Sequence, residues 1–279
     1  MSSDWVADPD EHLANGWERD LASDDSLLRA YTDAFAGMVV DIARAAGGRV
    51  LEDDRFVAAD AGTPSAYTNA AVLLGPLGEA ATVEAVSSLT SFFDAAPGGA
   101  WLLFSPVPTP DLRPQGLGAV GHPPLMFRPQ GGDRRPPPLE LEIVRVTDAP
   151  TLETFERTAI EAFPLPELAD VHSGTFMPSA LLDDDRFHFF LGLVDGRPIG
   201  TSMAHLGASM SHVEYVSAMP NARGRGYGEA MTWPATLADA EAPSMLIASD
   251  LGRPTYERMG YLTMARFTVW AGTRAKGKG

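Results

Sequence analysis

The chain has 279 residues, of which 45% are hydrophobic and 21% charged, a composition typical of a globular protein long enough for two domains. The formal net charge of -16 repels polyanions and argues against a nucleic-acid binder. Because cysteine is absent, disulfides, thiolate metal ligands and cysteine nucleophiles are excluded. Separately, we expect no metal cofactor.

Targeting and membrane signals are missing from the sequence. The acidic N-terminus lacks the basic and then apolar order of a signal peptide. No apolar run approaches the ~20 residues needed to cross a bilayer. We therefore expect a cytoplasmic protein with no membrane partner. Its oligomeric state is left open, and a homo-oligomer is compatible with the sequence.

The first half of the chain is predicted to be an α/β domain. An amphipathic helix is expected from Leu27 to Ala46, ended by two glycines. Strands are expected at Arg55–Ala59, Ala70–Leu74 and Trp101–Phe104, and a second helix at Glu79–Asp94. This half carries no recognisable chemical motif. Its His122, followed by two prolines, is interpreted either as part of a rigid loop lining an acceptor pocket or as a surface turn.

The segment from Arg128 to Pro138 is rich in proline and glycine and is predicted to be an interdomain linker. Proline and glycine at this density cannot continue a helix or a central strand. We therefore expect two domains, at residues 1–135 and 136–279.

The second half has a clear order of elements. A half-buried strand is predicted at Leu139–Val146, followed by a helix that Asp148 caps and Pro164 ends. Strands at Phe187–Val194 and Pro198–Leu206 are joined by the turn Asp195-Gly196, a typical two-residue hairpin signal.

A further strand at His212–Met219 leads into a glycine-rich turn and a helix. Then come the short strand Met245–Ala248, a helix around Tyr256, and a last strand at Thr263–Trp270. This order indicates one mixed sheet whose front part is antiparallel and whose later part is parallel.

The most informative segment is the turn that contains Gly224, Gly226 and Gly228, between a strand and a helix. Glycines there allow positive φ angles, so that several amide groups and the helix dipole can point at one anion. Spacing excludes a P-loop, since no Lys-Ser/Thr follows the last glycine, and it excludes the dinucleotide fingerprint. A glycine-rich turn without a ligand stays an alternative.

This turn and a second motif further along the chain resemble those of the GCN5-related N-acetyltransferases (GNAT). The run Arg223-Gly-Arg-Gly226-Tyr-Gly228 resembles the family signature Gln/Arg-x-x-Gly-x-Gly/Ala, and Tyr256-Glu-Arg-Met-Gly260-Tyr261 resembles its second hallmark. The resemblance covers residues 139–279 and implies a sheet of GNAT type preceded by a second α/β domain. The N-terminal half is a candidate for a degenerate copy of the same fold, although no such signature occurs before residue 139.

The resemblance also implies which residues bind acetyl-CoA as co-substrate. The pyrophosphate is expected at the loop and helix start, and the pantetheine arm along the preceding strand, where the amide of Ala218 polarises the acyl carbonyl. The cofactor-binding residues implied in this way are Val216, Ser217, Ala218, Arg223, Gly224, Arg225, Gly226, Tyr227, Gly228, Glu229 and Ser249. Ser249 stands where the family often has asparagine.

Catalysis is expected to need a base for the incoming amine and an acid for the leaving thiolate. Tyr256 occupies the family's acid position, and an ordinary tyrosine pKa of about 10 lies above that of a thiol. His212 and Glu214 alternate onto one face of the strand and are both candidates for the base, beside a water relay or no base at all.

Two functions follow from this resemblance. The first is transfer of an acetyl group from acetyl-CoA to an amine-bearing small molecule or peptide. The alternative is a non-catalytic, acyl-CoA-binding regulatory module, which would need the glycine turn but not Tyr256. One further departure is Pro234, which is expected to kink the helix after the turn.

Overall fold

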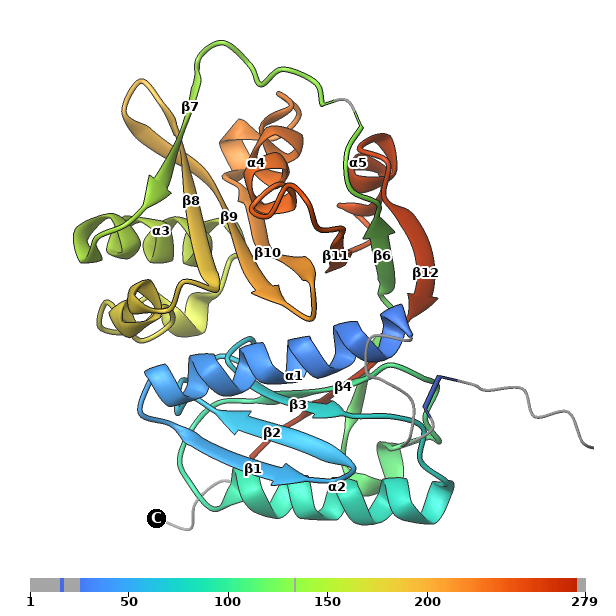
Figure 1. Cartoon of the computed structure of the whole chain (residues 1–279). Coiled ribbons are helices and arrows are strands. Elements are labelled where there is room, and N and C mark those ends of the chain that lie inside the picture. Colours follow the sequence, from blue (N-terminus) through green and yellow to red (C-terminus); the bar gives the residue numbers. More distant parts are fainter. Residues whose placement is uncertain (1–15, 18–25, 133, 275–279) are drawn as a thin grey trace, which may run out of the picture.

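The computed structural model describes residues 16–17, 26–132 and 134–274. They form two β-sheets with helices on their faces, and helix α1 (Leu27–Ala45) lies between the sheets (Figure 1). Within the described residues no helix is long and apolar enough to cross a membrane.

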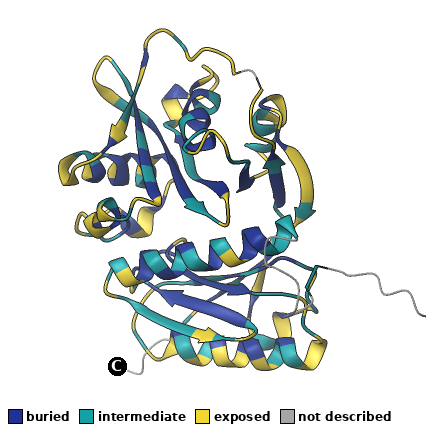
Figure 2. Ribbon diagram, viewed as in Figure 1, coloured by how far each residue is buried: buried dark blue, intermediate teal, exposed yellow. Residues whose placement is uncertain are grey.

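The first sheet has six strands in the order β1-β2-β3-β4-β13-β5. Their bounds are β1 (Arg49–Asp53), β2 (Phe56–Asp60), β3 (Asn69–Leu73), β4 (Trp101–Ser105), β13 (Thr268–Gly272) and β5 (Gly118–Gly121). Helix α1 contacts β1, β2 and β3, and helix α2 (Glu79–Asp94) contacts β2. Strands β2 and β3 are buried along their whole length, as expected for strands covered on both faces (Figure 2).

The second sheet has seven strands in the order β12-β6-β11-β10-β9-β8-β7. Their bounds are β12 (Leu262–Arg266), β6 (Pro124–Arg128), β11 (Ser244–Ile247), β10 (Met210–Ala218), β9 (Arg197–Gly207), β8 (Phe187–Val194) and β7 (Leu141–Val146). The helices of this half are α3 (Ala149–Ala162), α4 (Tyr227–Thr236) and α5 (Arg253–Arg258). The 3-10 helices within the described residues are η2 (Arg113–Gln115), η3 (Pro166–Leu168), η4 (Ser179–Asp183) and η5 (Pro220–Ala222). The pairs β7-β8, β8-β9 and β9-β10 are antiparallel and β10-β11 is parallel, so the predicted mixed sheet is confirmed.

Two local sequence signals of the second half, a predicted helix cap and a predicted hairpin turn, are confirmed by the structure. The carboxylate of Asp148 accepts from the amide of Thr151 at 2.8 Å and caps α3. Asp195 and Gly196 have φ of 50° and 72° and join β8 to β9 in the expected tight turn. Helix α4 contains Pro234 near its C-terminal end.

The two halves share an order of elements. In each half a helix is followed by three antiparallel strands, a crossover helix and a parallel strand: α1-β1-β2-β3-α2-β4 and α3-β8-β9-β10-α4-β11. Strand β13 then pairs with β4 and strand β6 with β11, both antiparallel. Each half thus lends one strand to the sheet of the other.

This exchange of strands corrects the prediction of a single last strand and bears on the predicted domain boundary. The single strand predicted at Thr263–Trp270 is two strands, β12 and β13, which belong to different sheets. The chain passes between the sheets at Phe267, whose ring is fully buried and lies edge-on to Tyr31 at 5.8 Å. The two sheets are not separated in sequence at residue 135, because β6 precedes the linker and pairs within the second sheet. Strands β1, β5 and β6 had not been predicted.

One buried cluster joins the two halves around α1. It contains Tyr31 and Phe35 of α1 together with Phe189 and Met203 of the second sheet. Ser26 caps α1 by accepting from the amide of Arg29, and the buried positions recur on one side of the helix. Helix α1 is therefore packed against both sheets at once.

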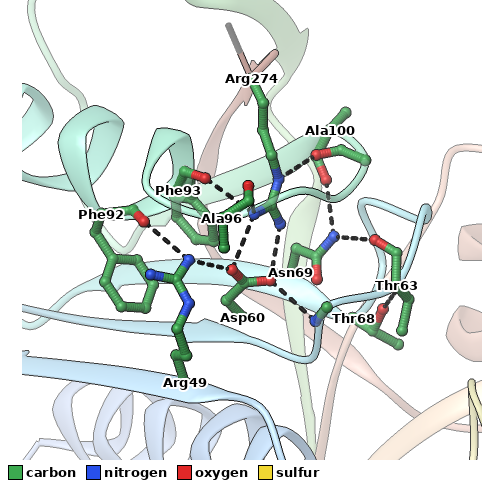
Figure 3. A network of polar contacts seen from close by, with 12 residues as sticks. Arg49, Asp60, Thr63, Thr68, Asn69, Phe92, Phe93, Ala96, Ala100 and Arg274 are labelled. Atoms are coloured by element: carbon green, nitrogen blue, oxygen red, sulfur yellow. Dashed lines mark hydrogen bonds and ion pairs between the residues drawn. The ribbon is translucent and has the colours of Figure 1, made fainter. Parts of the chain in front are cut away.

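A buried charge network fixes the end of β13 to the first sheet. The guanidinium of Arg274 donates to both carboxylate oxygens of Asp60, at 2.8 and 2.9 Å, and Arg49 donates to the same carboxylate at 2.6 Å (Figure 3). The side chains of Arg274 and Asp60 are only 5% and 1% exposed. Burial opposes the charge on Asp60, but these hydrogen bonds outweigh it and hold the pKa of Asp60 below its ordinary value.

We predict that Arg274→Met lowers the free energy of unfolding by about 3–5 kcal/mol, because it leaves the buried Asp60 carboxylate with only the half-buried Arg49 and the amide of Gly62 as partners. Chemical denaturation at neutral pH measures this. Since the pKa of Asp60 is depressed in the folded chain, the stabilisation is present above its ordinary pKa of about 4 and is lost as the pH falls further.

Arg113→Met is the matched control. Arg113 pairs with Asp111 on the surface, where the two side chains are 74% and 49% exposed. Exposed pairs stabilise by about 0–1 kcal/mol, so this variant should unfold nearly as the parent does. Equal losses for both variants would contradict the role given to the buried network.

Candidate active site

The second sheet opens between β10 and β11. The two strands pair only at Ser211 with Ser244 and at His212 with Met245. On the other edge of β10 the register with β9 shifts between Glu214 and Ser217, which is a β-bulge. Tyr215 within the bulge has a φ of 49°, unusual for a residue other than glycine. A gap therefore begins at the middle of β10 and runs toward its C-terminal end.

The glycine-rich turn follows the end of β10. Gly224 and Gly226 have φ of 78° and 82°, and residues 223–226 are exposed. Gly226 precedes α4, and the amide of Ala230 bonds to its carbonyl at 3.0 Å. The amides of Tyr227, Gly228 and Glu229 precede the first intrahelical bond and are free to bind an anion at the positive end of the helix.

The two arginines of the turn differ in their surroundings. Arg223 donates to the carbonyls of Ala162 at 3.0 Å and of Ala218 at 3.2 Å. Its guanidinium therefore ties the turn to the ends of α3 and β10, instead of extending toward an anion. Arg225 is exposed, and its guanidinium interacts with the hydroxyl of Tyr227 and the carboxylate of Glu140.

The side chains of the first turn of α4 point away from the glycines. Tyr227 is buried and its hydroxyl donates to Glu140 at 2.8 Å. Glu229 lies 3.9 Å from Arg258 of α5. These two residues thus contribute only their amides to the anion-binding surface.

A cavity of about 260 Å³ lies where the gap meets the first half of the chain. From the second half it is lined by residues of β10 and by the side chains of Ile247, Ser249 and Tyr256. From the first half it is lined by α1, by β4 and by the residues before and in β3. The cavity therefore belongs to both halves.

Among the described residues that line this cavity, Glu214 is the one with a carboxyl group. Burial raises its pKa to about 8, an effect that a hydrogen bond from the hydroxyl of Tyr31 partly offsets. That hydroxyl lies 3.4 Å from Oε1 of Glu214. A carboxyl with a pKa near neutrality can accept and release protons at physiological pH, as a general base must.

Tyr256 lines the same cavity from α5. Burial, and then the neighbouring Tyr261 and Glu214, raise its pKa above the ordinary tyrosine value. The hydroxyl therefore stays protonated at neutral pH and is available as a proton donor. Ser249 also lines the cavity, and its Oγ accepts from the amide of Gly252 at 3.1 Å.

The structure places the side chain of His212 in the core beside α1. Its side chain is fully buried, stacks on Tyr31 at 4.8 Å, and does not line the cavity. Burial lowers the pKa of His212 to about 3, so the ring is neutral. His212 and Glu214 do alternate onto one side of β10, as expected, but α1 closes over the histidine and leaves only the glutamate at the cavity.

Of the strand residues expected along a pantetheine arm, Val216 lines the cavity. The side chain of Ser217 is turned the other way, and its Oγ lies 2.7 Å from Oγ1 of Thr201 on β9. The carbonyl of Ala218 accepts from Arg223. His122 is exposed and lies outside the cavity lining, in keeping with a surface turn.

Sequence reasoning missed Tyr31 and the other contributions of α1. The periodicity of α1 predicted an amphipathic helix, yet the contact between Tyr31 and Glu214 joins residues 183 positions apart. Only the three-dimensional packing brings them together.

We predict that the carboxyl of Glu214 titrates near pH 8, as measured by NMR of a chain with labelled glutamate carboxyls. Tyr31→Phe should raise this pKa further, because it removes a hydrogen bond that favours the charged form. Tyr227→Phe is the control: it removes a hydroxyl from Glu140 and should leave Glu214 unchanged. Titration of Glu214 near 4.5 would contradict the environment described here.

Known proteins resemble this chain in structure but not in sequence: no family model and no curated protein matches it. A GCN5-related N-acetyltransferase from Kribbella flavida has a TM-score of 0.63 and 20% identity over 87% of this chain and 95% of that one. A GCN5-related N-acetyltransferase from Sphaerobacter thermophilus has a TM-score of 0.52 and 16% identity, covering 89% and 94%.

A putative GNAT acetyltransferase from Novosphingobium aromaticivorans has a TM-score of 0.51 and 17% identity, covering 81% of this chain and 92% of that one. These shares of the chain extend well beyond residues 139–279, so the likeness includes the first half. At such identities the likeness is evidence of the fold.

Proposed function

Since the chain has the fold of the GCN5-related N-acetyltransferases, we propose that it is an N-acyltransferase that moves an acetyl group from acetyl-CoA to an amine. The observation that supports this most directly is one continuous arrangement. The gap beside β10 has an exposed, glycine-rich turn at its outer end and a cavity with Glu214 and Tyr256 at its inner end.

The binding roles follow from this arrangement. The amides of residues 225–229 and the dipole of α4 suit the pyrophosphate of coenzyme A, with Arg225 beside it. The pantetheine arm would run along Val216, Ser217 and Ala218, where β10 has no neighbouring strand on the side of β11 among the described residues. Ser249 would contact the arm from the opposite side. Arg223 acts by positioning the turn.

Transfer needs two proton movements. Glu214 takes a proton from the ammonium of the acceptor, and the neutral amine attacks the thioester carbonyl. The carbon–nitrogen bond forms, the carbon–sulfur bond breaks, and the hydroxyl of Tyr256 protonates the departing thiolate. The second proton lost by the nitrogen restores that hydroxyl, so the products are the amide and free coenzyme A.

We also infer that the first half is a degenerate copy of the second. The order of its elements is the same, and β13 takes beside β4 the place that β6 takes beside β11. The turn after β3 differs, however: a Cβ atom at Gly75 would lie 3.0 Å from the ring of Trp17. Because that ring covers the turn and the first half has no glycine signature, we infer that the first half contributes residues to the site of the second half.

We predict that Gly226→Val weakens binding of acetyl-CoA by about tenfold or more in titration calorimetry. A β-branched residue does not tolerate the φ of 82° there, so the turn must lose the geometry that presents its amides.

Gly196→Val is the control, because Gly196 also has positive φ but lies in the β8-β9 hairpin. It should carry similar backbone strain and bind acetyl-CoA as the parent does. Unaltered binding by the Gly226 variant would remove the turn as the pyrophosphate site.

We predict that Tyr256→Phe lowers kcat by about 100-fold or more while the Kd for acetyl-CoA stays unchanged, because only the proton donor is lost. Release of free thiol from acetyl-CoA across a panel of amines measures kcat, and calorimetry measures Kd. Unchanged turnover would remove Tyr256 as the acid. Tight binding of acetyl-CoA without turnover of any amine would favour the non-catalytic binding module.

A further inference from the structure

We propose that the acceptor is a small monoamine with an apolar alkyl or aryl body, selected by helix α1 of the first half. This inference rests on the proposed function and specifies its substrate class. It is drawn from the lining of the cavity, its charge and its size.

Helix α1 gives the cavity an apolar wall. Phe35, Met38, Val39 and Ile42 all line it, at the spacing that places residues on one face of a helix. The charged residues of α1 lie elsewhere: Arg29 pairs with Asp33 at 4.0 Å, Arg44 is exposed, and Asp41 pairs with Arg186.

The other walls extend this apolar surface. Leu102 and Phe104 line the cavity from β4, and Phe163 lines it from the end of α3. Burying an apolar body against such walls stabilises the complex by about 0.8 kcal/mol for each methylene group. A hydrophilic acceptor would gain nothing from them.

The charge of the lining limits the acceptor to one ammonium group. Among the described residues Glu214 is the one carboxyl group of the lining, and the remaining polar lining groups are hydroxyls, such as those of Thr68 and Tyr67. A second buried ammonium would have no further carboxylate of this described lining to pair with, which is unfavourable. Glu214 also fixes the direction of the ligand, since the ammonium must lie at the β10 end with its body toward α1.

The size of the cavity agrees with this. At about 260 Å³ it is smaller than the roughly 300–1,000 Å³ of pockets for drug-sized ligands, and the acyl group needs part of it. The net charge of -16 attracts cations of every kind to the protein, so selection among them has to occur in this apolar cavity.

The first experiment uses the full chain and acetyl-CoA with linear amines from propylamine to hexylamine, and with 1,6-diaminohexane. We expect kcat/KM, measured by thiol release, to rise by about fourfold for each methylene until the cavity is filled. The diamine should fall at least about tenfold below hexylamine, because its second ammonium has no partner.

The second experiment changes the charge of the wall. Val39 is half-buried, so Val39→Asp adds a carboxylate to the lining and should shift the preference from hexylamine toward the diamine by about tenfold or more. Val39→Asn, of similar shape but neutral, should not shift it toward the diamine. Gly37→Asp adds the same charge to α1 outside the cavity lining, with open space for the new side chain, and should keep the parent's preference.

The outcomes separate the two proposals. Turnover that favours the diamine over hexylamine, or that is flat along the alkyl series, would overturn the monoamine inference and leave the acetyltransferase function intact. Faster transfer from hexanoyl-CoA than from acetyl-CoA, without a preference among amines, would also overturn the monoamine inference, because the apolar walls would then bind the acyl chain. Absence of thiol release with every amine would overturn both. If Val39→Asp does not fold, as judged by thermal unfolding, the comparison of the linear amines with the diamine on the parent chain still tests the inference.

Discussion

Two exchanged strands make the halves of this chain one folding unit. Strand β13 pairs with β4 and β5 inside the first sheet, and β6 pairs with β11 and β12 inside the second. Neither sheet is complete without a strand from the other half. The buried contacts of Arg274 with Asp60 hold the end of β13 in place, and Phe267 fills the core where the chain passes between the sheets. The relative position of the halves is thus set by backbone hydrogen bonds on both sides of the interface.

The environment of the candidate active site depends on that fixed position. Helix α1 lies over the opening between β10 and β11, where it excludes water from Glu214 and supplies the hydroxyl of Tyr31. Exclusion of water is what raises the pKa of Glu214, whereas the same helix closes His212 into the core. A strongly acidic protein thereby contains an apolar cavity whose described lining has one carboxyl group, available to the amine proposed above.

The sequence predicted best those features that depend on neighbouring residues. Asp148 as a helix cap, the Asp195-Gly196 turn, and the positive φ of Gly224 and Gly226 all follow from local conformational preferences. Strand pairing between distant segments left no such signal: nothing near residues 124–128 or 268–272 indicates which sheet they join. The sequence left His212 and Glu214 both open as the base for the same reason. Period-2 alternation places both on one side of β10, and only the position of α1 decides which is buried.

The exchanged strands also bear on what happens when the chain is interrupted. A single proteolytic nick in the exposed linker between β6 and β7 would cut the polypeptide without freeing either part. The N-terminal fragment would keep β6 paired within the second sheet, and the C-terminal fragment would keep β13 paired within the first sheet. The nicked protein should therefore persist as a non-covalent complex, and the two fragments, made separately, are suited to reconstitute it by complementation.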